Sequence, residues 1–512
     1  MIEFIKKLFG IAQTQEKNPE ENEEEKNPKT PISTSLPETL EYLKNEFNSS
    51  SDFIKREFEI DGTKAAIINM DGLINKEILA TSVINPIRKC SPIVQNNPIE
   101  KYNYIRDNIL STADQVEAKT YEEVIKFMTS GSAMLAIDGC NIILAIGIQG
   151  FNFRGITEPP NEVMQRESKE GFVEPLRINA TMIRRRIRSP KLKFEMMTLG
   201  SVTETDIYLC YLSDVSSKFL VDEMKKRLKK IQINGVLAAG YVSEFLEENR
   251  NVSLFSSVGV SERPDTVCAK ILEGRVAVLV DGTPSVIIAP FLFTEYFQSL
   301  DDYTTKPYFA TLTRWLKYFS FFLATLLPGF YVATGTFNPE LLPNQLIGKI
   351  SIAVATTPFS LMFEAFLIHL IYEIMREAGL RLPKPLGHAI SIVGGLVIGQ
   401  TAVSSGLIGG PTLMVVALTA LASYVIPNIY EPLAILRLAF IFVGGIMGTW
   451  GIMLLFSAVL VDICAKTNFG VPYASPISPF NWFGMRDVFI RSGFRTLSKK
   501  VNPVQKMPGS KI

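Results

Sequence analysis

The sequence predicts an α/β (α+β) N-terminal region of two subdomains, followed by an α-helical polytopic membrane domain. From Trp315 to Cys464, twelve of 150 residues are charged, about 8%, against 20% for the whole chain. This block contains several apolar runs close to the ~20 residues that a helix needs to cross a bilayer. Before residue 300, strand-like and helix-like runs alternate, and two strand pairs are joined by an Asp-Gly turn. Such a turn suits a tight hairpin, because both residues tolerate the positive φ that it requires.

The totals exclude several classes of protein. The chain has 512 residues with 52 basic and 51 acidic side chains, so its net charge of +1 does not predict binding to nucleic acid. Its five cysteines are scattered and it has two histidines, so neither a disulfide framework nor a structural zinc site is expected. No phosphate-binding loop, nucleophile elbow, HExxH or dinucleotide-binding motif is present, so the sequence predicts neither an enzyme nor a cofactor.

Residues 1–37 are expected to form a disordered polar tail that begins with a short helix. Apolar residues at helical spacing near the start predict that helix. The run EENEEEK at Glu20–Lys26 belongs to a composition that buries too little apolar surface to fold. No signal-peptide core is found, so the N-terminal region is expected to stay in the cytoplasm.

The first α/β subdomain is predicted over residues 38–157. Its pattern changes between alternating runs, typical of strands, and runs with apolar residues three or four apart, typical of helices. The predicted helices are Leu36–Phe47, Ile78–Ile87 and Thr120–Ser130, and the predicted strands are Phe53–Ile60, Ala65–Ile68 and the two halves of Ala133–Ile146 around Asp138-Gly139.

The second α/β subdomain is predicted over residues 158–300, after a break at Glu158-Pro159-Pro160. Its predicted elements are the helices Arg177–Ile187, Lys218–Ile231 and Gly240–Glu248, the strand Asp206–Leu212, and the strand pair Arg275–Ile288 around Asp281-Gly282. Because both subdomains contain the same kind of hairpin, we expect them to be related.

A basic run includes Arg184, Arg185 and Arg186. Such a run could bind phosphate, anionic lipid or nucleic acid. No aromatic-glycine signature of a nucleic-acid-binding fold accompanies it, and acidic residues balance it elsewhere. A solvated face, or a contact with another subunit, is therefore the favoured interpretation.

The membrane domain is predicted over residues 301–470, after an aromatic segment that suits a membrane interface. Residues 471–512 form a basic C-terminal tail, which the positive-inside rule assigns to the cytoplasm. Both ends then lie on one side, which requires an even number of crossings. We therefore expect four spans, with residues 345–385 as a re-entrant, interfacial or amphipathic element; a fifth span over Ile350–Glu373 is the alternative. The expected spans are Trp315–Thr334, Leu386–Ile408, Pro411–Pro427 and Ile435–Cys464.

Ionisable residues within the apolar block are candidates for function, because they are costly in a membrane and usually face a bundle interior or water. Glu364, His369 and Glu373 lie in the segment that does not fit a simple span. His369 and Glu373 share a helix face, which suits one metal ion or, as we favour, a hydrogen-bonded pair. Arg437 and Asp462 lie at the two ends of one apolar run, where snorkelling to the interface explains them.

The run Leu386–Ile408 adds the polar residues Gln400, Thr401 and Ser404. Side chains of this kind join helices or line a water-filled path, and helix packing is the default interpretation. Together with Glu364, His369 and Glu373, they form the set of pore or gate candidates.

Several stretches closely resemble the A subunit of the GerA family of spore germinant receptors. The most specific is EAGLRLPKPLGHAISIVGGLVIG within Glu373–Val403, and the resemblance spans about residues 50–482. One departure is the Arg166-Glu167-Ser168-Lys169 before Glu170-Gly171-Phe172, where the family usually has Arg-Gly-Pro. The other matching stretches are Asn69–Ile78, Glu170–Lys193, Asp281–Tyr303, Leu327–Pro343, Ser423–Asn428 and Phe469–Phe480.

The resemblance implies a multi-pass protein of the bacterial spore inner membrane, with its N- and C-terminal regions in the cytoplasm and in contact with membrane lipid. It implies a homo-oligomer that acts with a transporter-like B subunit, which recognises the germinant, and a lipoprotein C subunit. The implied function is signal transduction in germination, as a ligand-gated ion channel that releases monovalent cations. A secondary transporter component and a membrane-anchored scaffold for partner subunits are the alternatives.

Overall fold

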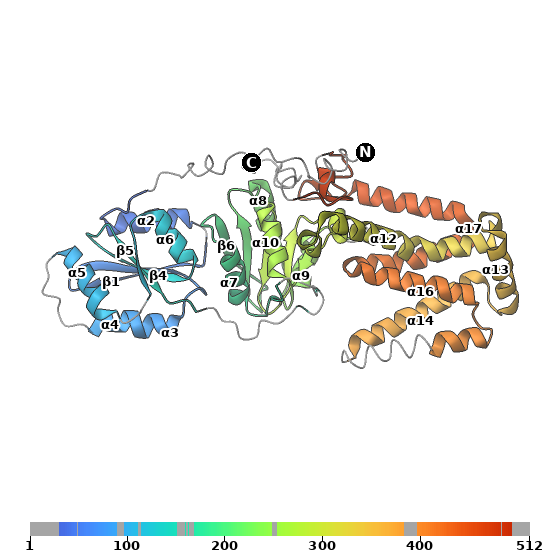
Figure 1. Cartoon of the computed structure of the whole chain (residues 1–512), viewed down its shortest axis with the longest axis horizontal. Coiled ribbons are helices and arrows are strands. Elements are labelled where there is room, and N and C mark those ends of the chain that lie inside the picture. Colours follow the sequence, from blue (N-terminus) through green and yellow to red (C-terminus); the bar gives the residue numbers. More distant parts are fainter. Residues whose placement is uncertain are drawn as a thin grey trace.

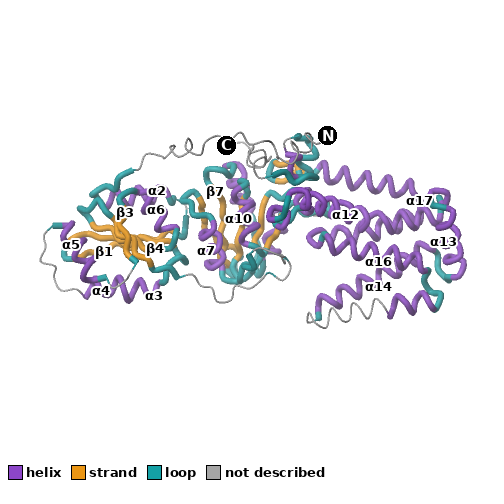
Figure 2. The backbone as a smooth tube through the Cα atoms, in the orientation of Figure 1, coloured by secondary structure: helices purple, strands orange, loops and turns teal. Residues whose placement is uncertain are grey.

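The computed structural model describes residues 30–48, 50–89, 97–110, 114–150, 159, 162, 168–247, 253–382, 397–482 and 484–493. Two α/β units and a helical region follow one another along the long axis of the molecule (Figure 1). Both five-stranded sheets belong to the two N-terminal units, and the third region is helical (Figure 2). The predicted fold class is therefore confirmed. Of the disordered tail expected over residues 1–37, residues 1–29 with the short helix lie outside the described residues. Residues 30–37 are not a disordered tail but pack on the first unit, where Pro31 pairs with Thr120 and Ile32 is buried in the core.

The first unit is an antiparallel sheet in the order β1-β2-β4-β5-β3, with helices on both faces. Its central strands read as continuous apolar runs because both of their faces are covered. The strands are β1 Phe53–Ile60, β2 Thr63–Met70, β3 Gln115–Ala118, β4 Ser132–Ile137 and β5 Ile143–Gly147. The helices are α2 Leu36–Glu46, α3 Lys76–Ile78, α4 Asn85–Lys89, α5 Pro98–Tyr104 and α6 Tyr121–Thr129, with π-helical turns at Leu79–Ile84 and Ile105–Ile109.

The second unit repeats this arrangement, with the order β6-β7-β9-β10-β8. The helices α7 and α10 pack on one face of the sheet, and α8 and α9 pack on the other. The strands are β6 Leu192–Leu199, β7 Thr205–Leu212, β8 Gly259–Ser261, β9 Val276–Val280 and β10 Val286–Ala289. The helices are α7 Leu176–Arg186, α8 Lys218–Lys229, α9 Ala239–Leu246 and α10 Pro264–Leu272.

The two Asp-Gly hairpins occupy equivalent places in these sheets. Asp138 accepts a hydrogen bond from the backbone N–H of Leu36, and Asp281 accepts one from the N–H of Leu176, both at 2.9 Å. Each carboxylate thus caps the first turn of the helix that precedes its own sheet, where free N–H groups and the helix dipole favour an anion. The Asp-Gly turn therefore both reverses the chain and fixes a helix.

The helical region begins after short turns at η4 Phe293–Phe297 and α11 Asp301–Thr304. Among the described residues, α12 and the stretch Pro427–Ala465 are long and apolar enough to cross a membrane, and the bent pair α13 and α14 makes a third if it counts as one span. The helices are α12 Pro307–Thr336, α13 Asn344–Thr356, α14 Leu361–Arg381, α16 Gly410–Val425 and α17 Tyr430–Ala465, with 3₁₀ turns η5 Pro339–Leu341 and η6 Pro427–Ile429.

The chain reverses its direction within α17, at Gly448. This residue has φ 64° and ψ −152° and lies beside Phe337, which follows the end of α12. Further on, Phe456 has returned to Phe322 near the middle of α12, with the ring centroids 6.3 Å apart. The first half of α17 therefore runs outward along α12, and the second half runs back.

The single span predicted over Ile435–Cys464 is therefore wrong. Each half of α17 has about 18 residues and a length of about 27 Å, which is close to the ~30 Å of a bilayer core. Hydropathy does not separate one long apolar helix from two antiparallel ones. Residues 345–385, which were expected to form a re-entrant, interfacial or amphipathic element, contain two helices, α13 and α14, that are bent by 80° relative to each other. Of the expected span Leu386–Ile408, residues 386–396 lie outside the described residues, and residues 397–404 are helical.

After α17 the chain folds back onto the second unit. The hairpin of β11 Thr467–Asn468 and β12 Val471–Pro472 contributes Phe469 and Val471 to the core that α8 and α9 cover. The limit expected at residue 470, between membrane domain and tail, falls inside this hairpin. Residues 473–482 and 484–493, with the 3₁₀ turn η7 Gly484–Asp487, follow this hairpin, and residues 487–491 contact the start of α12. This part of the predicted tail is thus integral to the fold.

Candidate functional site

Glu373 of α14 and Arg437 of α17 form an ion pair inside the helical region. The Arg437 Nη2 atom lies 3.3 Å from Glu373 Oε1, and Arg437 is 1% exposed. The Tyr430 hydroxyl donates to the same carboxylate at 2.8 Å, and the Arg376 Nε atom lies 3.1 Å from it. Glu373, which is partly exposed, therefore has three cationic or hydroxyl partners, and it compensates the charge of the buried Arg437.

Aromatic rings surround the two guanidinium groups. Arg376 lies 4.0 Å from the ring centroid of Tyr430, and Arg437 lies 5.7 Å from that of Tyr372. Cations over aromatic faces are stabilised most where water is excluded. Arg437 thus lies within the bundle, which corrects the expectation that it snorkels to the interface. Its partner Glu373 is 64 residues away, so no local pattern indicated the pair.

His369 lies one turn before Glu373 on α14 and is 1% exposed. Its Nδ1 atom is 2.8 Å from the carbonyl oxygen of Ala365, which assigns the proton of the neutral ring to Nδ1. Its Nε2 atom, like Nη1 of Arg437, is buried without a hydrogen-bond partner among the described residues. A donor and an acceptor in this state are sites where a buried water lowers the free energy.

The two roles weighed for His369 and Glu373 are not found in the structure. They form no hydrogen bond with each other, because His369 binds the Ala365 carbonyl and Glu373 binds Arg437 and Tyr430. Within the described residues, no group of three or more His, Cys, Asp or Glu side chains could hold a metal ion.

Glu364 lies inside the bundle and caps another helix. It is 1% exposed, and its Oε1 atom accepts a hydrogen bond of 2.6 Å from the backbone N–H of Gly409. Gly409 is the N-cap residue of α16, so the carboxylate lies where the dipole and the free N–H groups of α16 favour negative charge. A Cβ atom at Gly409 would lie 3.2 Å from this oxygen, so glycine permits the approach.

Gln400, Thr401 and Ser404 are all exposed on the helical residues 397–404. The Ser404 hydroxyl donates to the carbonyl of Thr401 at 3.1 Å. On the other face of these residues, Gly399 approaches Leu413 of α16. The structure thus separates the predicted pore or gate candidates into a helix cap, an ion-pair cluster and an outward polar face.

The basic run of the second unit is paired within the chain. Arg184 is 1% exposed and binds Asp52 of the first unit, with an Nε–Oδ2 distance of 2.8 Å. Arg185 and Arg186 are half-buried and both bind Glu170 at 2.6 Å. Arg184 therefore joins the two units, which corrects the expectation of a solvated face. A subunit contact by Arg185 and Arg186 stays a prediction.

A second buried ionic cluster joins α12 to the C-terminal segment. Arg314, which is fully buried, lies 2.7 Å from both Asp302 and Asp487. The Tyr303 hydroxyl donates to the same Asp487 carboxylate at 2.5 Å. Burial raises the pKa of Asp487, although Arg314 and Tyr303 favour its charged form. Sequence reasoning missed this cluster; its one signal was that Asp487 is the sole acid of the basic tail.

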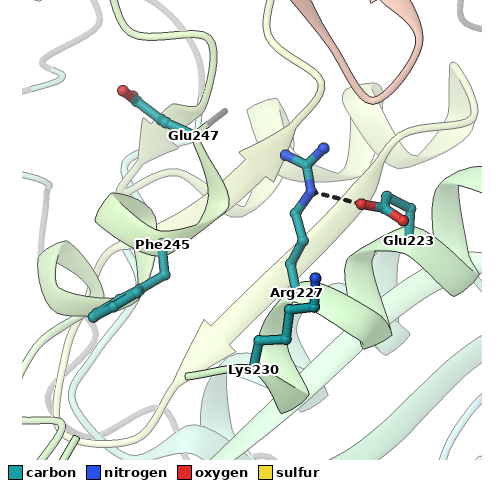
Figure 3. A pocket seen from close by; sticks show the side chains of 5 residues that line it. All are labelled: Glu223, Arg227, Lys230, Phe245 and Glu247. Atoms are coloured by element: carbon teal, nitrogen blue, oxygen red, sulfur yellow. Dashed lines mark hydrogen bonds and ion pairs between the residues drawn. The ribbon is translucent and has the colours of Figure 1, made fainter. Parts of the chain in front are cut away.

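A shallow pocket of about 320 Å³ lies between α8 and α9 (Figure 3). Arg227 extends along it, with Nε 3.1 Å from Glu223, and donates through Nη1 to Asn468 of the β11–β12 hairpin at 2.9 Å. Its guanidinium also lies 4.0 Å from the ring centroid of Phe469. Arg227 therefore holds the returning chain against the second unit. The lining residues are Glu223, Arg227, Lys230, Phe245 and Glu247.

Comparison with known proteins agrees with the resemblance read from the sequence. A family model described as "Bacillus/Clostridium GerA spore germination protein" matches residues 41–502. The chain is 37% identical over 480 residues to Spore germination protein KA of Bacillus subtilis (strain 168), covering 93% of this chain and 88% of that one. It is 32% identical over 458 residues to Spore germination protein GerLA of Bacillus cereus, and the match covers 89% of this chain and 92% of that one. A solved structure is also similar: the crystal structure of the N-terminal domain of the A subunit of the Bacillus megaterium spore germinant receptor GerK3. It is 30% identical in sequence with a TM-score of 0.42, and the match covers 52% of this chain and 99% of that one.

Proposed function

Because the chain belongs to the GerA family of spore germination proteins, we propose that it is the A-type subunit of a nutrient germinant receptor. In this proposal it lies in the inner membrane of the spore, forms a homo-oligomer, and acts with a transporter-like B subunit and a lipoprotein C subunit. Its role is to pass the germinant signal on as a ligand-gated path for monovalent cations. We propose no enzymatic activity, since Spore germination protein KA and Spore germination protein GerLA are named for germination and for no reaction.

The orientation proposed for the chain has both terminal regions in the cytoplasm. The helical region leaves the second unit through α12 and returns to it through α17, where Ser253 donates to Asp462 at 2.9 Å. Both ends of the region therefore lie on one side of it. The basic residues that follow the last helix favour the cytoplasm for that side.

The observation that carries the channel proposal is the polar face of residues 397–404. Gln400, Thr401 and Ser404 are exposed on a single chain. An amide facing lipid is costly, because lipid offers no hydrogen-bond partner. The free energy is lower if this face meets other subunits around a water-filled axis.

The test is the replacement of Ser404 by leucine in spores that depend on this receptor. The matched control is Ser457→Leu, since Ser457 is also exposed and its hydroxyl likewise donates to a carbonyl of its own helix, that of Met453. We expect Ser404→Leu to slow cation release after germinant addition and Ser457→Leu to leave it unchanged, at equal amounts of receptor. Normal release by Ser404→Leu, and by Gln400→Leu, would exclude this face from the path.

The same spores separate the alternatives. If the chain is a secondary transporter component, the complex should take up labelled germinant. If it is a scaffold, Ser404→Leu and Gln400→Leu should both leave cation release unchanged, whereas loss of the chain should abolish receptor assembly. Either result would replace the channel proposal.

A further inference from the structure

The start of α12 defines the level at which the protein leaves the bilayer. With 30 residues, α12 is about 45 Å long, so about ten of its residues extend beyond a ~30 Å hydrocarbon core. Phe456 of the returning half of α17 lies beside Phe322. Counting outward in both helices, Asp462 then lies level with Leu316. With the opposite boundary at the end of α12, Thr336, the ~20 residues inside the hydrocarbon core reach back to about Leu316. The boundary next to the N-terminal units is therefore close to Trp315 on α12 and Asp462 on α17.

The segment after α17 lies at this same level. The Trp315 indole N–H donates to the carbonyl of Phe489 at 2.9 Å, and Arg314 binds Asp487. Residues 487–489 are thus held beside the turn of α12 that meets the boundary. Because Asp487 and Arg314 are both tied into the buried cluster, this placement is fixed by the fold.

Two large aromatic side chains project from this segment. Phe480 is 64% exposed and Trp482 is 71% exposed, with their ring centroids 6.1 Å apart. Tyr473, a few residues earlier in the same segment, is 1% exposed. Adjacent exposed aromatic rings on an otherwise packed segment mark a contact surface.

The first turn of α12 presents similar side chains. Tyr308 is 57% exposed and Phe309 is 53% exposed, and the Lys306 ammonium lies 6.0 Å from the Tyr308 ring centroid. Tryptophan and tyrosine with nearby lysine are typical of the headgroup layer, where an apolar ring and a polar tip are both satisfied. The partner that fits this composition is lipid, since the lysine suits a lipid phosphate and the rings suit the headgroup layer.

We propose that residues 480–482 and 484–489 form a membrane-interface anchor, with Phe480 and Trp482 inserted among the lipid headgroups of the leaflet next to the N-terminal units. The anchor holds Asp487 on Arg314, and it thereby fixes the depth of α12 relative to the second unit. This inference concerns lipid contact alone and does not depend on the proposed receptor or channel function.

The test uses the full chain in nanodiscs of phosphatidylcholine and phosphatidylglycerol, with tryptophan fluorescence as the readout. Subtracting the spectrum of Trp482→Phe from that of the wild type isolates the signal of Trp482 from those of Trp315 and Trp450. We expect lipids brominated close to the headgroup to remove most of this signal, and aqueous acrylamide to remove little of it. The control is Tyr241→Trp on α9, an exposed position of the second unit, where we expect acrylamide to quench and lipid bromine not to.

Two results would overturn the proposal. Quenching of Trp482 by acrylamide alone, as at position 241, would mean that the residue faces water. Protection from both quenchers would mean that protein covers it, either a second copy or another part of the same chain. Phe480→Trp in the Trp482→Phe background is a second probe of the same surface, so a local disturbance at one position cannot decide the outcome. An unchanged thermal midpoint of each variant shows that the fold is retained.

Discussion

The reversal of α17 at Gly448 makes a quantitative prediction. The backbone of this residue has φ 64° and ψ −152°, a region that is essentially restricted to glycine. A side chain there costs about 1–3 kcal/mol in backbone strain. A Cβ atom at Gly448 would lie 3.2 Å from Cβ of Phe337, a tight contact that a displacement of a few tenths of an ångström relieves. The strain therefore dominates the effect of Gly448→Ala.

The matched control is Gly348→Ala in α13. Gly348 lies inside a helix, and a Cβ atom there would have no heavy atom within 4 Å. Alanine in a helix is more stable than glycine by about 0.5–1 kcal/mol, so this variant is expected to be neutral or stabilising. The two variants make the same chemical change, and they differ in the backbone conformation that the new side chain meets and in the close contact with Phe337.

The assay is the thermal midpoint of the purified full chain in detergent. A change of 1 kcal/mol shifts the midpoint of a unit of 150–250 residues by about 2–4 °C, so Gly448→Ala should lower it by several degrees. Gly348→Ala should leave it unchanged or raise it. If both variants have the same midpoint, the backbone of residue 448 is helical in the folded protein, and the antiparallel arrangement of the two halves of α17 is refuted.

Two further predictions concern ion pairs and protonation. Glu373→Gln should destabilise the helical region by about 3–5 kcal/mol, because it leaves Arg437 buried with an uncompensated charge. In the control Glu377→Gln, the lost carboxylate is exposed and pairs with Arg381, so the change should cost at most about 1 kcal/mol. Equal thermal midpoints of the two variants would contradict the buried pair. Burial, with Arg184 and Lys191 nearby, lowers the pKa of Lys193 to about 8, against about 10.4 in the unfolded chain. Between these two pKa values the unfolded chain binds a proton at Lys193 that the folded chain does not, so stability rises with pH. In denaturant titrations, the free energy of unfolding of the wild type relative to Lys193→Met should therefore rise from about pH 8 to about pH 10. A constant difference between the two proteins over that window would contradict the lowered pKa.

The α/β units were predictable where the signal was local. The helix α2 and the hairpins around Asp138 and Asp281 are encoded by periodicity and turn residues within short windows. The strands β3 and β8 were not predicted, because they have four and three residues and are defined by pairing with distant partners. Sequence reasoning therefore recognised the repeated hairpin but not that the whole sheet order repeats.

The candidate site was less predictable, because its partners lie far apart in the chain. Glu364 was expected in the bundle interior, but its role as a cap depends on Gly409, 45 residues later. Arg437 lies near one end of an apolar run, and the same hydropathy profile fits an interface position or a buried pair with Glu373. The length of the run Ile435–Cys464 was the one available sign of the reversal, since it exceeds the ~20 residues that one crossing needs.

The two connections between the second unit and the helical region limit how one can move against the other. α12 is held by Arg314 between Asp302 and Asp487, and the chain after α17 is held by Arg227 at Asn468. Separating one partner of a buried pair such as Arg314–Asp487 costs about 3–5 kcal/mol, whereas small helix shifts within a packed bundle keep their contacts. A displacement of the second unit therefore reaches α12 and the returning half of α17 together. These helices meet at their far ends beside Gly448, so such a displacement is carried along both helices to the reversal that joins the two halves of α17.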